Sequence, residues 1–169
     1  MANLPYVDRS TAPDEVRRVL DGLPDLNLFR MVAHAESALV PWLRYGGALL
    51  TGLELDPLER ELAILRVASF MRSDYEWVQH AEITEAVGGS AEQVAAVERG
   101  ELDSALFDES QQAVLRFATD VLTRRDPAVG DMPPRKVVEL LLVVGHYTAI
   151  AMLIAATGIE TDDPAGLGR

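Results

Sequence analysis

The amino-acid sequence predicts an all-α protein, a bundle of six to eight helices with no sheet. Three observations predict this class. Apolar residues recur at helical spacing in successive segments, helix-starting residues precede most of these segments, and no stretch alternates apolar and polar residues as a strand does. A length of 169 residues suits one domain, which we expect over 1–159.

The N-terminal part predicts two helices. The first should begin at 13–15, because proline is favoured in a first turn and acidic residues face the positive end of the helix dipole. It should end before Pro24. The second is predicted over 27–50, bent or split at Pro41, which lacks a backbone N–H.

Two further helices are predicted to form a hairpin. Asp56-Pro57 is a helix start with proline at the first helical position, and a strongly apolar helix follows as far as Phe70. A second helix restarts at Ser73 and should end at Gly88-Gly89, where glycine supplies a left-handed stop.

The C-terminal half predicts three more helices. Ser90-x-x-Gln93 is a capping-box pattern for a short helix that ends at Gly100. The next helix is predicted over 108–122, and a loop with proline and glycine separates it from a long apolar helix over 133–157. The small, acidic residues at 160–169 predict a flexible tail.

The most apolar stretch, 140–157, is interrupted by Gly145, His146 and Tyr147. It has no flanking basic cluster or aromatic belt, so we interpret it as a core or interface helix rather than a membrane span. The N-terminus also lacks the pattern of a signal peptide. We therefore expect the protein in the cytoplasm, without a membrane partner.

Composition excludes several functions. A net charge of −12 argues against nucleic acid, because binding at phosphates needs clustered Lys and Arg. The chain has no cysteine, and hence no disulfide, thiolate metal site or thiol redox chemistry. In so acidic a protein, an anionic substrate would have to be attracted locally by particular arginines and helix N-termini.

The residues that indicate chemistry lie in the predicted helix after Ser73. Ser73, Glu76 and His80 are spaced i, i+3 and i+7, so they share one helix face. A carboxylate one turn before an imidazole can orient it and raise its basicity. Such a pair is the minimum set for general acid–base catalysis near neutral pH, although His80 could also be a histidine satisfied at a helix–helix contact.

Glu61 is out of place on the apolar helix before this segment. A buried carboxylate must find a partner or take up a proton, because an unpaired buried charge is costly. If the two helices form an antiparallel hairpin, Glu61 can face His80 and act as a second acid for it. The other interpretation pairs Glu61 with Arg66, or with Arg60 at the surface.

Several segments resemble the carboxymuconolactone decarboxylase-like and alkylhydroperoxidase D-like superfamily. They are 58–68 (LERELAILRVA), 73–80 (SDYEWVQH) with the following Gly88, 27–34 (NLFRMVAH) and the long helix with His146-Tyr147. The resemblance covers most of the chain. It implies an orthogonal bundle of the alkylhydroperoxidase D type, assembled as a homo-oligomer, with a trimer or hexamer expected first and a dimer as the alternative.

The resemblance also bears on activity. Peroxidase-type members carry a Glu, then Cys-x-x-Cys, then a His four residues later, and here Ser73 and Glu76 stand in place of the cysteines. A hydroxyl and a carboxylate cannot cycle through sulfenic acid and disulfide, so thiol peroxidase activity is not expected. The Glu-x-x-x-His pair of the lactone decarboxylases matches Glu76 and His80, but those enzymes lack an acid at the position of Glu61.

These features predict a cofactor-independent acid–base enzyme, a decarboxylase, lyase or isomerase acting on a small carbonyl or lactone acid. His80 would move the proton, with Glu61, Glu76 and Ser73 as the other catalytic residues. Candidate substrate-binding residues are Tyr75, Arg66, Arg30, His146 and Tyr147. No histidine spacing supports a metal site. The alternative is a non-catalytic helical scaffold or small-molecule-binding protein without redox cysteines.

Overall fold

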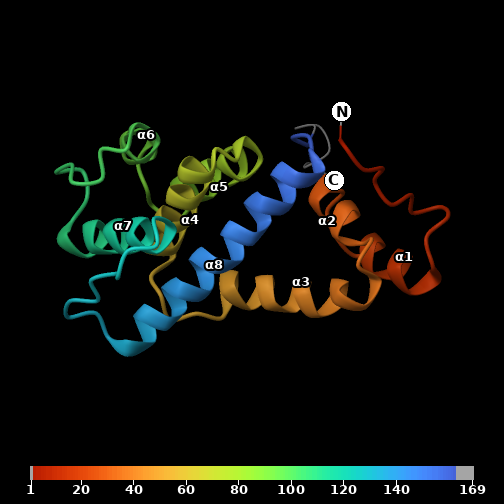
Figure 1. The fold of residues 1–169 in the computed structure, drawn as a ribbon, viewed down its shortest axis with the longest axis horizontal. Coiled ribbons are helices and arrows are strands. Elements are labelled where there is room, and N and C mark those ends of the chain that lie inside the picture. The colour runs from red at the N-terminus through yellow and green to blue at the C-terminus, as the bar shows by residue number, and fades with distance from the viewer. Residues whose placement is uncertain (1, 163–169) are drawn as a thin grey trace. The chain divides into compact units, whose positions relative to one another are not determined.

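The computed structural model describes residues 2–162, and these residues form eight α-helices and no strand, which confirms the predicted fold class. Figure 1 shows the helices in chain order. They are α1 (Asp14–Asp21), α2 (Asn27–Val32), α3 (Glu36–Thr51), α4 (Pro57–Met71), α5 (Asp74–Ala86), α6 (Ala91–Arg99), α7 (Glu109–Leu122) and α8 (Pro134–Thr157).

The chain divides into two compact units. One comprises Met1–Thr51 and Leu153–Arg169, and the other comprises Gly52–Met152. The single domain over 1–159 stays a prediction. Of the predicted tail, 163–169 lies outside the described residues, and the residue before it, Asp162, accepts a hydrogen bond from the backbone N–H of Asn27 through its side chain.

The first unit contains α1, α2, α3 and the last residues of α8. The predicted second helix is divided, but at 33–35 and not at Pro41, which lies inside α3. The division occurs because the carbonyl of Ala35 accepts from the N–H groups of Ala38 and Leu39 and so begins a new helix. The expectation of a split at Pro41 was therefore wrong, whereas a bend at Pro41 stays a prediction.

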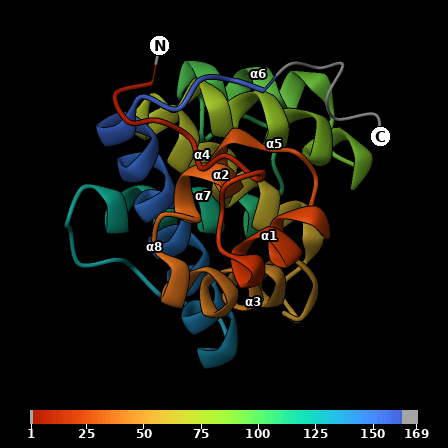
Figure 2. The ribbon, with the colours of Figure 1, turned by 90° about the vertical axis from the view of Figure 1, so that its right-hand side faces the viewer.

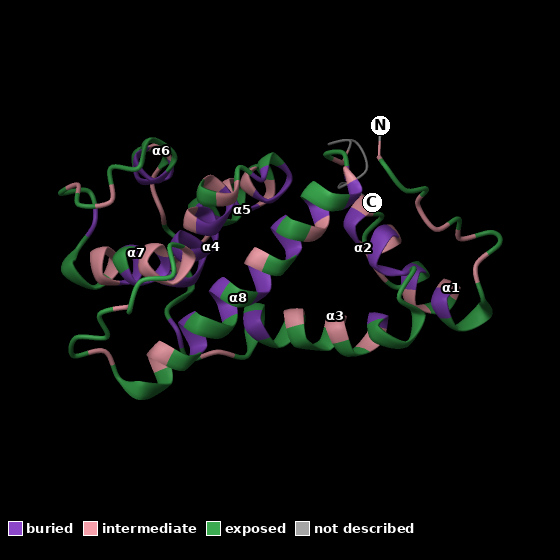
Figure 3. Ribbon diagram, in the orientation of Figure 1, coloured by how far each residue is buried: buried purple, intermediate pink, exposed green. Residues whose placement is uncertain are grey.

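The second unit is built around α4, which packs against α5, α6 and α7. Figure 1 shows α4, α5, α6 and α7 grouped together at the left, and Figure 2 shows the same helices turned by 90°. Nine of the fifteen residues of α4 are buried. Figure 3 colours buried residues purple. The sequence explains the burial of α4, because this helix is apolar on nearly all sides.

Capping residues set the ends of these helices as predicted. Asp56 accepts hydrogen bonds from the N–H groups of Leu58 and Glu59 at the start of α4. Ser90 and Gln93 complete the capping box of α6, and Gly100 ends that helix in the left-handed region.

One hydrophobic cluster holds α4, α6 and α7 together. Its members are apolar side chains with at most 9% of their surface exposed: Leu62, Leu65, Val94, Ala96, Val97, Phe107 and Leu115. Trp77 and Ala81 of α5 pack against this cluster. The cluster therefore fixes α5, and the residues it carries, relative to α4.

The link between α4 and α5 is short. Only Arg72 and Ser73 separate the two helices, and Arg72 adopts a left-handed conformation with φ 55° at the C-cap of α4. A link this short forces the chain to reverse, which makes α4 and α5 the helical hairpin that the sequence predicts. Residues in the first part of α5 are thereby held against α4.

The long apolar helix is observed as α8. By length and composition it is the one helix within residues 2–162 that could cross a membrane, but half of its most apolar stretch is buried inside the protein. Core helices of soluble proteins have the same properties, so this is weak evidence for a membrane span.

Candidate active site

Glu61 lies at the centre of the candidate site. Its side chain, on α4, is fully buried, with 0% of its surface exposed. One carboxylate oxygen accepts a hydrogen bond from Arg60 Nε at 3.0 Å, and the other lies 2.6 Å from His80 Nδ1 on α5. The hairpin thus brings Glu61 to His80, as one interpretation of the sequence predicted. Glu61 also pairs with an arginine, as the other interpretation predicted, and this arginine is Arg60 rather than Arg66.

This contact determines how the His80 ring is used. A carboxylate oxygen can only accept, so Nδ1 carries the hydrogen and donates it to Glu61. In the neutral ring, Nε2 is then the nitrogen with the free electron pair. The Glu61–His80 pair therefore holds one ring nitrogen and leaves the other for proton transfer.

Glu76 lies one helical turn from His80 and Ser73 lies two turns from it, and both are buried, with 3% and 5% of their surfaces exposed. Within residues 2–162, the two carboxylate oxygens of Glu76 have no hydrogen-bond partner, and the hydroxyl of Ser73 has none either. Burial raises the pKa of Glu76 to about 7, and the nearby Ser73 hydroxyl lowers that pKa in part although it makes no bond of ordinary geometry.

Two residues of α8 contribute to the same site. The ring of Tyr147 packs edge-on against His80, with 4.9 Å between centroids and 89° between planes, and His146 packs against Tyr147. Burial raises the pKa of the Tyr147 hydroxyl, and the charges of Glu61 and Glu76 raise it further. Tyr147 therefore lies within electrostatic reach of both carboxylates. Burial also lowers the pKa of His146.

The other candidate residues lie elsewhere or are simply buried. Arg66 points to α7, where its Nε donates to Thr119 Oγ1 at 2.8 Å, and its guanidinium lies over the Phe70 ring. Tyr75 is a buried residue of α5. Arg30 belongs to the first unit, where its Nε donates to the carbonyl of Val7.

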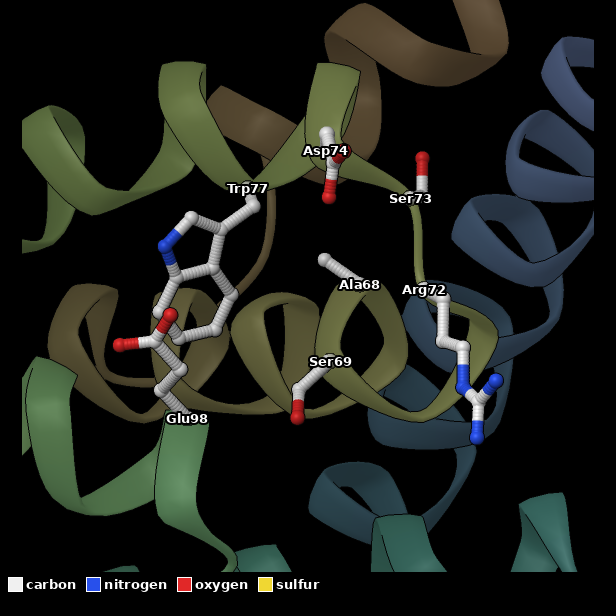
Figure 4. A pocket seen from close by; sticks show the side chains of 7 residues that line it. All are labelled: Ala68, Ser69, Arg72, Ser73, Asp74, Trp77 and Glu98. Atoms are coloured by element: carbon white, nitrogen blue, oxygen red, sulfur yellow. The ribbon is translucent and has the colours of Figure 1, made fainter.

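A cavity of about 310 Å³ opens at the turn between α4 and α5. Figure 4 shows Trp77 and Glu98 on one side of it and Arg72 on the other. The Ser73 hydroxyl points away from the Arg72 side chain. Ser73 therefore borders this cavity and also lies one turn from Glu76.

Arg60 was expected as a partner of Glu61 at the surface, and this was right about the partner but wrong about its location. Arg60 is 9% exposed and pairs with Glu61 inside the second unit. The sequence did contain a sign of this burial, because Arg60 lies on a helix that is apolar on nearly all sides. Within the described part of the chain, no group of three or more His, Asp or Glu side chains could hold a metal ion.

Two solved structures share this fold. One is the alkylhydroperoxidase AhpD core of an uncharacterized peroxidase-related protein from Ralstonia eutropha JMP134, with a TM-score of 0.78, 18% identity, and coverage of 96% of this chain and 93% of that one. The other is an uncharacterized peroxidase-related protein from Silicibacter sp. TM1040, with a TM-score of 0.79, 19% identity, and coverage of 99% and 95%. The protein therefore has the fold of the alkylhydroperoxidase AhpD core.

The family match is consistent with this fold. The model of the carboxymuconolactone decarboxylase family matches residues 38–120, which include Glu61, Ser73, Glu76 and His80. The family match over residues 38–120 and the shared fold support a place in the carboxymuconolactone decarboxylase and alkylhydroperoxidase D-like superfamily. No curated protein matches the sequence significantly.

Proposed function

We propose that the protein is a cofactor-independent acid–base enzyme, a decarboxylase, lyase or isomerase that acts on a small carbonyl or lactone acid. The observation that carries the proposal is the buried contact of 2.6 Å between His80 Nδ1 and Glu61. It holds the ring in one orientation and directs Nε2 to a reacting group.

The chemistry needs only one mobile proton. In an isomerisation, Nε2 takes a proton from the carbon next to a carbonyl, the electron pair forms a C=C bond, and the carbonyl oxygen becomes negative. In a decarboxylation, Nε2 first takes a proton from solvent. The C–CO₂ bond then breaks to give the same kind of enolate, CO₂ leaves, and Nε2 delivers its proton to carbon and returns to the neutral ring. Glu61 stabilises the imidazolium that is present in either reaction.

The remaining buried groups have supporting roles. Glu76, one turn from His80, controls the charge of the site, because a carboxyl group with a pKa near 7 changes its charge around neutral pH. Ser73 and Tyr75 supply hydrogen bonds to the substrate, and Tyr147 forms part of the wall around His80.

Exchange of hydrogen between substrate and solvent tests the proposal. The protein is incubated in D₂O with a panel of small keto acids and carboxylated lactones, and deuterium uptake next to the carbonyl is followed by NMR. The wild type should catalyse uptake or CO₂ release with one class. His80→Asn should reduce the rate by about 10² to 10⁴-fold.

His34→Asn is the matched control, because His34 is an exposed histidine of the first unit whose Nε2 lies 2.7 Å from the Pro5 carbonyl oxygen. It should keep the wild-type rate. Equal rates in wild type and a folded His80→Asn variant would contradict the proposal and favour a non-catalytic binding protein.

We expect the enzyme to be a homo-oligomer. Val138, Leu141 and Met152 on α8 are 54%, 41% and 60% exposed, and apolar side chains in such a row commonly form contacts between subunits. A cytoplasmic location also remains an expectation from the sequence.

A further inference from the structure

Four carboxylates are buried in the second unit, and three of them have partners. Glu61 pairs with Arg60 and His80. Glu59 pairs with Lys136 Nζ at 2.7 Å and accepts from the hydroxyl of Ser110. The third, Glu139, pairs with Arg135 and accepts from two backbone N–H groups. Glu76 is the fourth, and both of its oxygens are buried without a partner in the described residues.

The neighbouring Ser73 hydroxyl is in the same condition. Three polar atoms, two from Glu76 and one from Ser73, are thus buried without a hydrogen bond within residues 2–162, one turn apart on one face of α5. Leaving such atoms without a hydrogen bond destabilises a folded protein. Buried polar groups of native proteins are nearly always satisfied, so this group of atoms indicates a ligand.

Burial favours the neutral form of Glu76. On α4 the carboxylate of Glu61 is paired with Arg60, and on α8 Tyr147 lies within electrostatic reach of Glu76 and packs against His146. On α5 its titratable neighbour is His80, whose donor nitrogen is already bound to Glu61. On the α6 side, Glu98 adds only a further negative charge at the cavity wall. Below about pH 7, Glu76 therefore keeps its proton and can donate it in a hydrogen bond.

We propose that Ser73 and Glu76 form an oxyanion site, in which the hydroxyl and the neutral carboxylic acid both donate hydrogen bonds to one ligand oxygen that becomes negative. The matching ligand class is an enolisable carbonyl compound, bound through its enolate oxygen. Neutral donors suit this task, because their bonds strengthen as charge develops on the ligand oxygen. This inference rests on the proposed function, because the enolate formed in that reaction is the oxyanion that Ser73 and Glu76 would bind.

Stable oxyanions test this site without any turnover. The first probe is 4-nitrophenol, because its phenolate absorbs visible light and its neutral form does not. The second is 1,3-cyclohexanedione, which is an enolate in neutral solution and has a different shape. Affinities are measured by absorbance and by calorimetry between pH 6 and pH 9.

The wild type should bind the anionic form of at least one probe. Affinity for that form should fall roughly tenfold for each pH unit above 7, because Glu76 loses its proton in that range. Glu76→Gln, whose amide can still donate, should bind with an affinity that does not change over the same range. Ser73→Ala should bind about fivefold more weakly, as expected for one lost hydrogen bond.

His80→Asn separates this inference from the proposed function. It should abolish hydrogen exchange but keep the phenolate affinity and its pH dependence. If both probes bind as predicted while the wild type exchanges no hydrogen, the oxyanion site stands and the enzyme proposal fails. Failure of both probes to bind, a wild-type affinity that is constant with pH, or an unchanged slope in Glu76→Gln overturns the oxyanion site.

Discussion

Glu61 and Glu76 are carboxylates on the two facing helices of one hairpin, and both are almost completely buried. Their environments differ in one respect. Glu61 has a guanidinium and an imidazole as partners, so its bonding capacity is used. Glu76 has no such partner in the described residues, and burial therefore raises its pKa. One carboxylate orients the base, and the other is available as a neutral donor.

The raised pKa of Glu76 makes folding depend on pH. The unfolded chain releases this proton near pH 4.5 and the folded protein near pH 7, so the folded state binds the extra proton between these values. Stability should therefore fall as the pH rises across this window, by about 3 kcal/mol in total. Glu76→Gln should remove this fall, leaving stability unchanged near pH 4 and higher than wild type at pH 8.

Urea denaturation at pH 4, 6 and 8 measures this difference. Glu98→Gln, which changes an exposed carboxylate in the same unit, is the control and should follow the wild type. Parallel pH profiles for wild type and Glu76→Gln would show that Glu76 titrates alike in the folded and unfolded chains.

Removal of the Glu61 carboxylate should have a different effect. Glu61→Ala should destabilise the protein by about 3–5 kcal/mol, because it takes the carboxylate from both Arg60 and His80. Glu61→Gln should cost less. In ¹⁵N NMR spectra, the wild type should show the His80 hydrogen on Nδ1, and Glu61→Ala should show a mixture of the two tautomers. A single unchanged tautomer in that variant would contradict the role given to Glu61.

At the scale of elements, the α4–α5 hairpin and its neighbour α6 position these residues. Asp56 starts α4, and the αL residue Arg72 ends it. After α5 the chain turns at Gly88 and Gly89 before Ser90 caps α6. Gly89 lies so close to the end of α5 that a Cβ atom there would be 2.6 Å from Thr84 Cγ2 and 2.8 Å from the Thr84 carbonyl oxygen.

Gly89→Ala should therefore destabilise the second unit by about 1–3 kcal/mol, because the backbone of α5 must move to accept the methyl group. Gly145→Ala is the matched control, since a Cβ there has no atom within 4 Å and lies inside helix α8. It should be neutral or stabilise by up to about 1 kcal/mol. Thermal and urea denaturation of both variants measure this contrast, and equal losses of stability would contradict it.

At the scale of the whole molecule, a net charge of −12 lies on a chain that exposes apolar side chains along α8. The charge keeps the protein soluble, whereas the apolar row favours association of identical chains. The eight helices within residues 2–162 leave this apolar row of α8 exposed. We therefore expect a second copy of the chain on this surface.

Light scattering coupled to size-exclusion chromatography should give the mass of a trimer or hexamer. Val138→Lys places a charge in the apolar row and should shift the population toward smaller species, whereas Lys136→Arg, on the preceding turn, should not. A monomeric wild type at micromolar concentration would contradict this expectation.

The fold and much of the site could be predicted from local patterns. Ser73, Glu76 and His80 were grouped because helical spacing alone places them on one face. Glu61 was selected because a carboxylate on an apolar helix needs a partner. The pairing of Glu61 with Arg60 was one of the stated alternatives, but its burial could not be predicted before the helices were packed, and Arg66 could not be assigned to Thr119 before α7 was placed.

The sequence by itself determined the helical class, the helix ends and the residues available for chemistry, because caps, glycines and hydrophobic period act over a few residues. Only the tertiary structure decided which of those residues meet. It joined Glu61 to His80 and placed Tyr147 against the His80 ring, and it left Glu76 without a partner in the described residues. These outcomes depend on packing between helices distant in sequence, and a helix that is apolar on nearly all sides does not reveal which face meets its neighbour.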